Sequence, residues 1–222
     1  MDPNAPPVDP GKVWFVDKPL HWTSFDVVKK MRGHFKVKKI GHAGTLDPLA
    51  TGLLILCSGK KTKKIEHYQG LEKEYTGIFR IGQTTPSFDL ETEIDSETDY
   101  SNISYEEVMD ATTKLTGTIA QIPPIYSAIK IDGKRAYKSA RAGEDVKLKS
   151  RMVQIQLFET SYINLPDVHF RIVCSKGTYV RSIARDFGQL LGVGSHLTEL
   201  RRVRIGEFHV DNAQSLKTLI EK

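Results

Sequence analysis

The sequence predicts a single α+β domain built on a mixed, mainly antiparallel sheet flanked by helices and loops. The chain has 222 residues, of which 39% are hydrophobic and 27% charged, which is enough for a real hydrophobic core. Segments with the strand period of two and segments with a helical period both occur. No repeat, linker or low-complexity segment interrupts them. We therefore expect a disordered tail over residues 1–12 and one domain over residues 13–222.

The first expected elements surround a glycine-rich stretch. Residues 13–16 predict a short strand, and Ser24 can cap a helix. The glycine-rich stretch over residues 41–52 leads into a buried run at residues 53–57, after which Thr62 opens a short basic helix. The apolar face of the first helix is expected to carry Phe25, Val28 and Met31.

The middle of the chain predicts a strand and a helix joined by a long loop. Side chains alternate over residues 75–81, as in a strand. An acidic surface loop follows Pro86. Ser104 and Glu107 form a capping box for a helix that Gly117 ends.

The C-terminal half predicts alternating short elements. Gly192 lies just past the end of its longest helix, where a left-handed residue commonly stops a helix. The expected elements are a short basic helix at residues 134–142, strands at 153–157 and 168–174, a helix at 179–191, a strand at 202–210 and a short terminal helix.

The net charge of +5 is unevenly distributed. Acidic residues occupy every second position from Asp89 to Asp99. Separated charge of this kind creates a basic face that attracts polyanions. Any one basic cluster is also compatible with solvated lysines, but four clusters with aromatic residues nearby favour nucleic acid as a partner. The basic clusters are residues 29–39, 60–64, 130–151 and 201–204.

The cysteines and the N-terminus indicate a cytoplasmic protein. Cys57 and Cys174 lie far apart in apolar runs and form no Cys-x-x-Cys pair, so we expect reduced, buried thiols. Residues 1–10 are polar and proline-rich, without the apolar core of a signal peptide. No run approaches the roughly 18 apolar residues of a membrane helix.

One carboxylate lies in the most unusual segment of the chain. Glycines in residues 41–52 permit backbone angles closed to other residues and allow close approach of a ligand. Pro48 restricts the backbone of Asp47, so Asp47 is expected to be held rigidly at a loop tip before a buried strand. Asp-Pro is also an ordinary turn former, so these local rules leave a purely structural role open.

Three familiar kinds of site have no support. Residues 59–62 resemble part of a phosphate-binding loop, but Leu54 stands where that loop requires glycine. The histidines are scattered without the spacing of zinc ligands. No serine lies in a Gly-x-Ser-x-Gly turn, so a hydrolase triad is not indicated.

The segment from Gly41 to Gly52 resembles the catalytic motif of the TruB family of pseudouridine synthases, and four further stretches match that family in order and spacing. The match spans roughly residues 13–210. The resemblance implies the pseudouridine synthase fold and isomerisation of uridine 55 in the T-loop of transfer RNA, with no cofactor or metal. The further stretches are Asp17-Lys18-Pro19 with Thr23-Ser24, Lys73-Glu74-Tyr75, Ile122-Pro123-Pro124 with Tyr126-Ser127-Ala128 and Lys130, and Cys174 to Arg181 with Leu200-Arg201-Arg202.

The resemblance also implies roles for individual residues. Asp47 would be the catalytic carboxylate, and Arg181 would pair with it and keep it ionised. Tyr75 would stack on the flipped-out uracil and could assist proton transfer, with Tyr179 flanking the site. His42 resembles the histidine that family members insert into the T-loop in place of the extruded nucleotide.

Further residues are assigned to the pocket wall and to RNA. Leu200 would pack on the wall of the pocket. Salt-sensitive contacts with phosphates are expected from Lys18, Lys60, Lys130 and Arg202. The family usually carries an aspartate after the Tyr75 strand that helps order the site, and Asp89 is the equivalent here.

Some questions remain open at this stage. Many family members continue into a small C-terminal PUA RNA-binding domain, whereas this chain ends about twenty residues after Arg202, so we expect a short form lacking that domain. We also expect a monomer, for want of an exposed apolar stripe. Two alternatives are a non-catalytic RNA-binding module on the same scaffold and a pseudouridine synthase with another RNA target.

Overall fold

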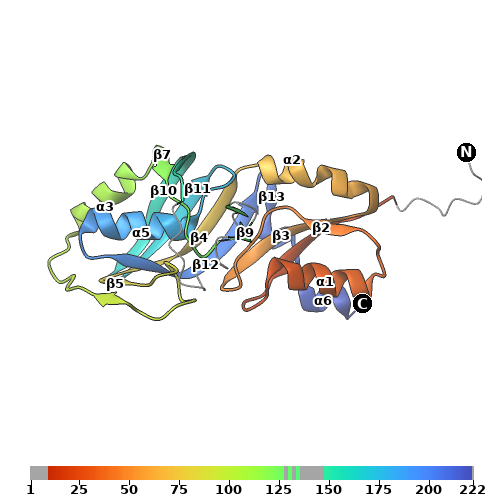
Figure 1. Ribbon diagram of the computed structural model, residues 1–222, viewed down its shortest axis with the longest axis horizontal. Coiled ribbons are helices and arrows are strands. Elements are labelled where there is room, and N and C mark those ends of the chain that lie inside the picture. Colours follow the sequence, from red (N-terminus) through yellow and green to blue (C-terminus); the bar gives the residue numbers. More distant parts are fainter. Residues whose placement is uncertain (1–9, 128–129, 132–133, 136–147, 222) are drawn as a thin grey trace, which may run out of the picture. The chain divides into compact units, whose positions relative to one another are not determined.

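The computed structural model describes residues 10–127, 130–131, 134–135 and 148–221 (Figure 1). Its contacts group the chain into two compact units, and one sheet contributes strands to both. The first unit comprises the chain up to Glu74 together with Arg201 onward, and the second comprises Tyr75–Leu200. Strands β4 (Lys73–Ile81) and β12 (Ser195–Ile205) each contribute residues to both units.

The first unit is built on strands in the order β14-β1-β3-β12, with β2 also paired to β3. Strands β1 and β3 are antiparallel, while β14 joins β1 in parallel, so the sheet is mixed as predicted. The strands are β1 (Val13–Lys18), β2 (Ile40–His42), β3 (Ala50–Ser58), β13 (Phe208–His209) and β14 (Gln214–Ser215), and the helices are α1 (Ser24–His34), η1 (Gly59–Lys64), α2 (Ile65–Gly70), η2 (Val210–Asn212) and α6 (Leu216–Ile220).

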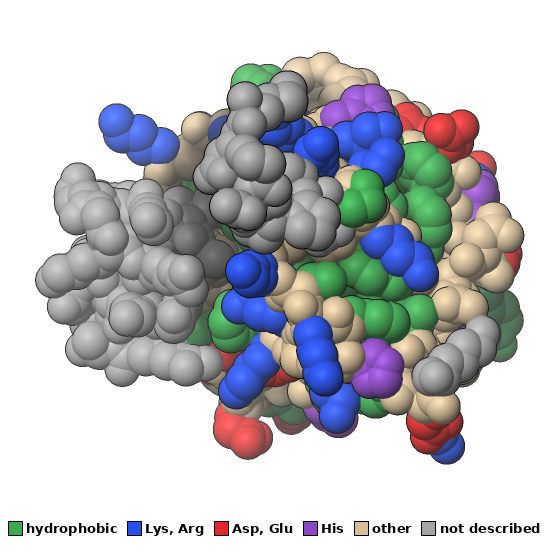
Figure 2. Space-filling model, turned by 90° about the vertical axis from the view of Figure 1, so that its right-hand side faces the viewer, with side chains coloured by type: hydrophobic (Ala, Val, Ile, Leu, Met, Phe, Trp, Pro, Cys, Tyr) green, Lys and Arg blue, Asp and Glu red, His purple; other side chains and the backbone are tan. Residues whose placement is uncertain are grey.

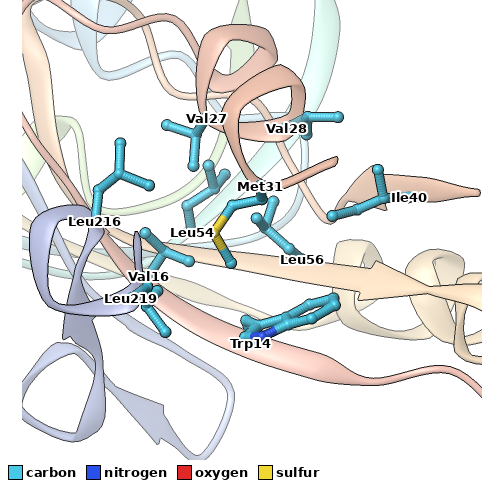
Figure 3. Packing of buried hydrophobic residues seen from close by; sticks show 10 residues of the cluster. All are labelled: Trp14, Val16, Val27, Val28, Met31, Ile40, Leu54, Leu56, Leu216 and Leu219. Atoms are coloured by element: carbon cyan, nitrogen blue, oxygen red, sulfur yellow. The ribbon is translucent and has the colours of Figure 1, made fainter. Parts of the chain in front are cut away.

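Strand β3 is buried on both of its faces. Leu54 and Leu56 pack in a cluster with side chains of α1 and α6, and Figure 3 shows Met31 of α1 pointing toward these strand residues. Leu53 and Ile55 instead pack in a second cluster that contains Tyr68 of α2. Successive side chains of a strand point to opposite faces, so the unbroken apolar run reflects burial on both sides. Helices α1 and α6 therefore cover one face of β3, and α2 covers the other (Figure 1).

The second unit has strands in the order β12-β4-β11-β10-β7, with antiparallel pairing of β10 to both β11 and β7. Phe79 of β4 stacks at 4.2 Å on Phe170 and at 5.6 Å on Phe187 of α5, which joins that helix to the sheet. The remaining elements are β5 (Gln83–Thr84), β6 (Ser96–Glu97), α3 (Tyr105–Lys114), β7 (Gly117–Gln121), β8 (Lys130–Ile131), β9 (Lys134–Arg135), β10 (Arg151–Asn164), β11 (Asp167–Cys174) and α5 (Val180–Leu191).

Two predicted helix ends are confirmed. The Ser104 hydroxyl accepts a hydrogen bond from the Glu107 amide at 3.2 Å, and the Glu107 carboxylate accepts from the Ser104 amide at 2.8 Å. Gly192 follows α5 with φ 74°, a left-handed conformation that glycine adopts without steric cost. Cys57 and Cys174 are both buried, reduced thiols, also as predicted.

The predicted start of α1 is wrong in two respects. Thr23, rather than Ser24, caps the helix, and its capping box is completed by Asp26. Phe25 was expected on the apolar face but is 62% exposed. The inward face instead carries Val27, Val28 and Met31, because these side chains pack against β3 and α6.

Two other expectations need correction. Lys134 and Arg135 form a strand instead of the start of a basic helix, because they pair with Lys130 and Ile131. The rest of that expected helix, residues 136–142, lies outside the described part of the chain. Lys12, placed in the tail, exchanges backbone hydrogen bonds with β3 through the Ser58 amide and hydroxyl. No helix in the described residues is both long and apolar enough to cross a membrane.

Candidate active site

Asp47 lies in a short loop between β2 and β3 of the first unit. The loop has no regular structure from Ala43 to Asp47, and β3 begins at Ala50. Ala43 and Leu46 are buried, whereas Asp47 itself is half-buried. Buried neighbours therefore anchor the loop and leave its carboxylate near the surface, as the sequence predicted for residues 41–52.

Ser24 holds the residue before Asp47. Its buried hydroxyl accepts a hydrogen bond from the Leu46 amide at 2.8 Å and donates one to the Leu46 carbonyl at 3.1 Å. This role explains why the neighbouring Thr23 caps α1 in place of Ser24. Sequence reasoning missed it, since Ser24 also fits the general pattern of a helix cap.

Two further contacts fix the residue after Asp47. The Pro48 carbonyl accepts a hydrogen bond from the His21 amide at 2.8 Å. The fully buried ammonium of Lys18 donates to the carbonyls of Trp22 at 2.6 Å and Pro19 at 2.9 Å, and reaches the Pro48 carbonyl at 3.5 Å. The loop is thus tied through its backbone to the chain that enters α1.

Arg202 clamps the loop from β12. Its guanidinium, only 1% exposed, donates to the carbonyl of Leu53 at 2.8 Å. It also donates to the carbonyls of Gly44 at 3.2 Å and Thr45 at 3.4 Å. A planar guanidinium can donate in several directions at once, so one side chain joins both sides of the Asp47 loop.

The absence of a side chain at Gly52 allows β12 to approach β3 closely enough for Arg202 to reach the loop. Its φ is 104°, and a Cβ atom at this position would lie 2.3 Å from the Arg202 carbonyl oxygen. Any larger residue would push the two strands apart at the point where Arg202 bonds to the loop.

The burial of Lys18 and Arg202 argues against the phosphate contacts that we expected of them. Their donors are directed to backbone carbonyls of the first unit, so both cations are structural supports of the Asp47 loop. Burial lowers the pKa of Lys18 to about 8, while the Asp47 carboxylate opposes this shift and Arg202 adds to it. The sequence predicted that Arg181 would be the cation that interacts with the Asp47 carboxylate. Lys18 also supplies such an interaction.

His42 and Lys60 occupy different environments in the same unit. His42 ends β2 and is half-buried, and burial lowers the pKa of its imidazole below the ordinary value, with Arg202 adding to the effect. The ring is therefore neutral at physiological pH. Lys60 is exposed on η1, as a phosphate contact requires. The side chain of Lys130 lies outside the described part of the structure.

Arg181 lies in the second unit, buried in the first turn of α5. It donates to the carbonyls of Tyr126 at 2.9 Å and Ser87 at 3.3 Å. Its Nε lies 3.5 Å from the buried carboxylate of Asp89. The aspartate that we expected to order the site is thus next to the arginine that we expected to pair with Asp47.

The remaining expected residues also belong to the second unit. Tyr75 is buried on β4, and Leu200 is half-buried on β12. Tyr179 precedes α5, where Gln121 accepts from its amide at 2.8 Å and donates to its carbonyl at 3.1 Å. The guanidinium of Arg151 lies 4.8 Å from the centre of the Tyr179 ring. Gln121 carries no signal in the sequence that would have identified this role.

The expected residues thus divide between the units. Asp47 is accompanied in the first unit by Lys18, His42, Lys60 and Arg202. The second unit holds Tyr75, Tyr179, Arg181 and Leu200, and Tyr75 and Leu200 are the residues at which the chain enters and leaves it. The ion pair between Asp47 and Arg181 stays a prediction.

Two family models match consecutive parts of the chain. The TruB family pseudouridylate synthase N-terminal domain matches residues 32–180. The tRNA pseudouridylate synthase B C-terminal domain matches residues 181–222. Together they span the Asp47 loop, Tyr75 and Arg181.

Similar proteins have nearly the same length. The tRNA pseudouridine synthase B of Flavobacterium johnsoniae is 53% identical over 96% of this chain and 95% of its own. The protein of the same name from Phocaeicola vulgatus is 50% identical over 95% and 92%. That from Chlorobaculum tepidum is 46% identical over 96% and 90%.

Solved structures share the fold. The crystal structure of a Cbf5-Nop10-Gar1 complex contains a chain that matches with a TM-score of 0.74 and 28% identity over 94% of this chain. A structure of an H/ACA RNP bound to a substrate RNA containing 2′-deoxyuridine matches with a TM-score of 0.71 and 25% identity. This chain spans about half of each of those chains, 53% and 52%.

We expect Arg202→Lys to lower the free energy of unfolding by about 1–3 kcal/mol, because an ammonium donates from one nitrogen and cannot span the carbonyls that the wider guanidinium reaches on both sides of the loop. Chemical denaturation measures the change. Arg201→Lys is the matched control, since Arg201 is 40% exposed and pairs with Asp17 at the surface, an interaction worth less than about 1 kcal/mol. Equal losses in the two variants would contradict the clamp.

Lys18 should titrate near pH 8, where NMR of labelled lysine can follow its amine. The unfolded chain retains this proton up to about pH 10.4, so between these values it binds more protons than the folded chain. The free energy of unfolding should therefore rise with pH across this window relative to Lys18→Met. A midpoint at the ordinary value, or no difference from the variant, would refute the shift.

Proposed function

This chain belongs to the TruB family of pseudouridylate synthases, and we propose that it isomerises uridine 55 in the T-loop of transfer RNA to pseudouridine, with Asp47 as the catalytic carboxylate. The observation that carries the role of Asp47 is the loop that presents it. Buried side chains on three different elements, β1, α1 and β12, bond to the backbone on either side of this one half-buried carboxylate. Such support is what a precisely positioned reacting group needs.

The reaction requires a charged carboxylate but no redox step. The bond from C1′ of the sugar to N1 of uracil breaks, and a bond from C1′ to C5 forms. The proton lost from C5 is balanced by one gained at N1. Asp47 would act either as a nucleophile or as an assistant to detachment and proton removal. Lys18 lies close enough to interact electrostatically with the Asp47 carboxylate, and Arg181 would pair with that carboxylate.

The target base must leave the stack of the T-loop before it can react. Tyr75 would receive the flipped uracil on its ring, an interaction worth roughly 1–3 kcal/mol per base. His42 would occupy the space that the nucleotide vacates, and a neutral imidazole suits this role because it stacks without carrying a charge into the loop. Leu200 and Tyr179 would complete the pocket.

Affinity would come mainly from exposed cations. Figure 2 shows Lys and Arg side chains across the face drawn at the right of Figure 1, with acidic side chains nearer its edges. Lys60 of η1 is the exposed cation that we assign to the backbone of the T-arm hairpin. Such contacts depend on the shape of the RNA more than on its sequence, and they weaken steeply with salt.

Asp47→Asn should abolish pseudouridine formation, with a loss of roughly three orders of magnitude or more, because the amide cannot supply the carboxylate chemistry. Tritium release from labelled tRNA measures the rate, and filter binding should show unchanged affinity. Asp211→Asn, an exposed residue of the same unit, is the matched control and should remain active.

Activity retained in Asp47→Asn would remove Asp47 from its role. The RNA target is tested separately by mapping pseudouridine in cells that lack the gene. We expect position 55 of tRNA to lose the modification, whereas loss at other RNA positions alone would favour a different target.

A further inference from the structure

A groove of about 620 Å³ lies in the first unit between helix α1 and the end of α6. It is separate from the Asp47 loop, and no role above uses it. We call it the α1 groove. Its walls include His21, Trp22, Lys29, Lys30, His34 and Ile220.

The charge of the α1 groove favours an anion. Lys29 and Lys30 are both exposed, as are the imidazoles of His21 and His34. Asp26 is the acidic residue among those that line the groove, but its carboxylate accepts hydrogen bonds from the amide of Thr23 at 3.0 Å and from its hydroxyl at 2.5 Å. That carboxylate caps α1 and also interacts electrostatically with Lys29, so it offsets part of the positive charge. Two exposed lysines still face one carboxylate in the lining of the groove.

The rim of the groove is fixed to the catalytic loop. His21 has a φ of 63°, a left-handed conformation that is uncommon for residues other than glycine and marks a position held by its surroundings. Its amide donates to the Pro48 carbonyl, next to Asp47, and the Trp22 carbonyl accepts from Lys18. The groove therefore lies beside the Asp47 loop without including it, and it follows α1, a helix of 11 residues and about 16 Å.

The α1 groove lies on the opposite face of β3 from Lys60. Helices α1 and α6 pack on the cluster containing Leu54, whereas α2, which continues directly from η1, packs on the cluster containing Leu53 (Figure 1). A hairpin bound at Lys60 would contact the surface that includes α2, on the other side of β3 from the groove. A second stretch of polyanion is needed to fill it.

We propose that the α1 groove binds the sugar–phosphate backbone of an RNA segment outside the hairpin that carries the target uridine. This inference rests on the proposed function, which assigns that hairpin to Lys60 and the Asp47 loop. Lys29 and Lys30 contact the phosphates of the segment, and the apolar surface of Trp22 and Ile220 accepts a ribose or base. Its role is to increase affinity for the complete tRNA over the isolated hairpin.

The test compares Lys29→Gln/Lys30→Gln with the unchanged protein on two RNAs, full-length tRNA and the isolated T-arm hairpin. We expect the double variant to bind full-length tRNA roughly tenfold more weakly and to lower the salt slope by about two. Its affinity for the hairpin should be unchanged. Lys217→Gln is the matched control, because this α6 lysine is 80% exposed but does not line the groove.

His21→Gly supplies a second probe that keeps the backbone amide. Glycine adopts the left-handed conformation without steric cost, so the variant should still fold while binding full-length tRNA more weakly. Unchanged tRNA affinity in both variants would overturn the proposal, and so would equal losses on tRNA and hairpin. These binding results are independent of turnover, whereas failure of the unchanged protein to modify either RNA would refute the proposed function instead.

Discussion

A buried guanidinium that bonds to backbone carbonyls is the interaction on which this site depends. Arg202 joins Gly44 and Thr45, before Asp47, to Leu53 in the strand that follows. A buried charge is costly unless all its donors are directed to acceptors. Because the acceptors here are main-chain carbonyls, the cost of burial is offset only when the loop has one particular shape. The same hydrogen bonds hold Asp47 in position, and its carboxylate is the group that we expect to take part in the reaction.

The double-faced burial of β3 determines where the other functions can lie. Leu54 and Leu53 pack against helices on opposite faces of β3. The first unit therefore has one surface formed by α1 and α6 and another formed by α2. Lys60 belongs to one of these surfaces and the α1 groove to the other.

Much of the fold could be predicted where local rules decide it. The capping box of Ser104 and Glu107, the left-handed Gly192 and the alternation in β4 depend on neighbours a few residues apart, and all three are confirmed. The rigid loop around Asp47 was also evident from its glycines. The roles of Lys18 and Arg202 were not, because charge suggests exposure, and only long-range pairing of β12 with β3 reveals that Arg202 is buried. Ser24 was misassigned because it fits the local pattern of a helix cap, whereas its bonds to Leu46 link residues 22 positions apart.

We expect Arg202 to act on the chemistry through the Asp47 loop and not through contact with RNA. The most direct test is the single-turnover rate of pseudouridine formation in Arg202→Lys at saturating tRNA, measured together with the dissociation constant. We expect the rate to fall roughly tenfold to a hundredfold, since small misplacement of a reacting group has effects of this size, with tRNA affinity unchanged. An unchanged rate with weakened tRNA binding would contradict this expectation and would indicate that Arg202 contacts phosphate.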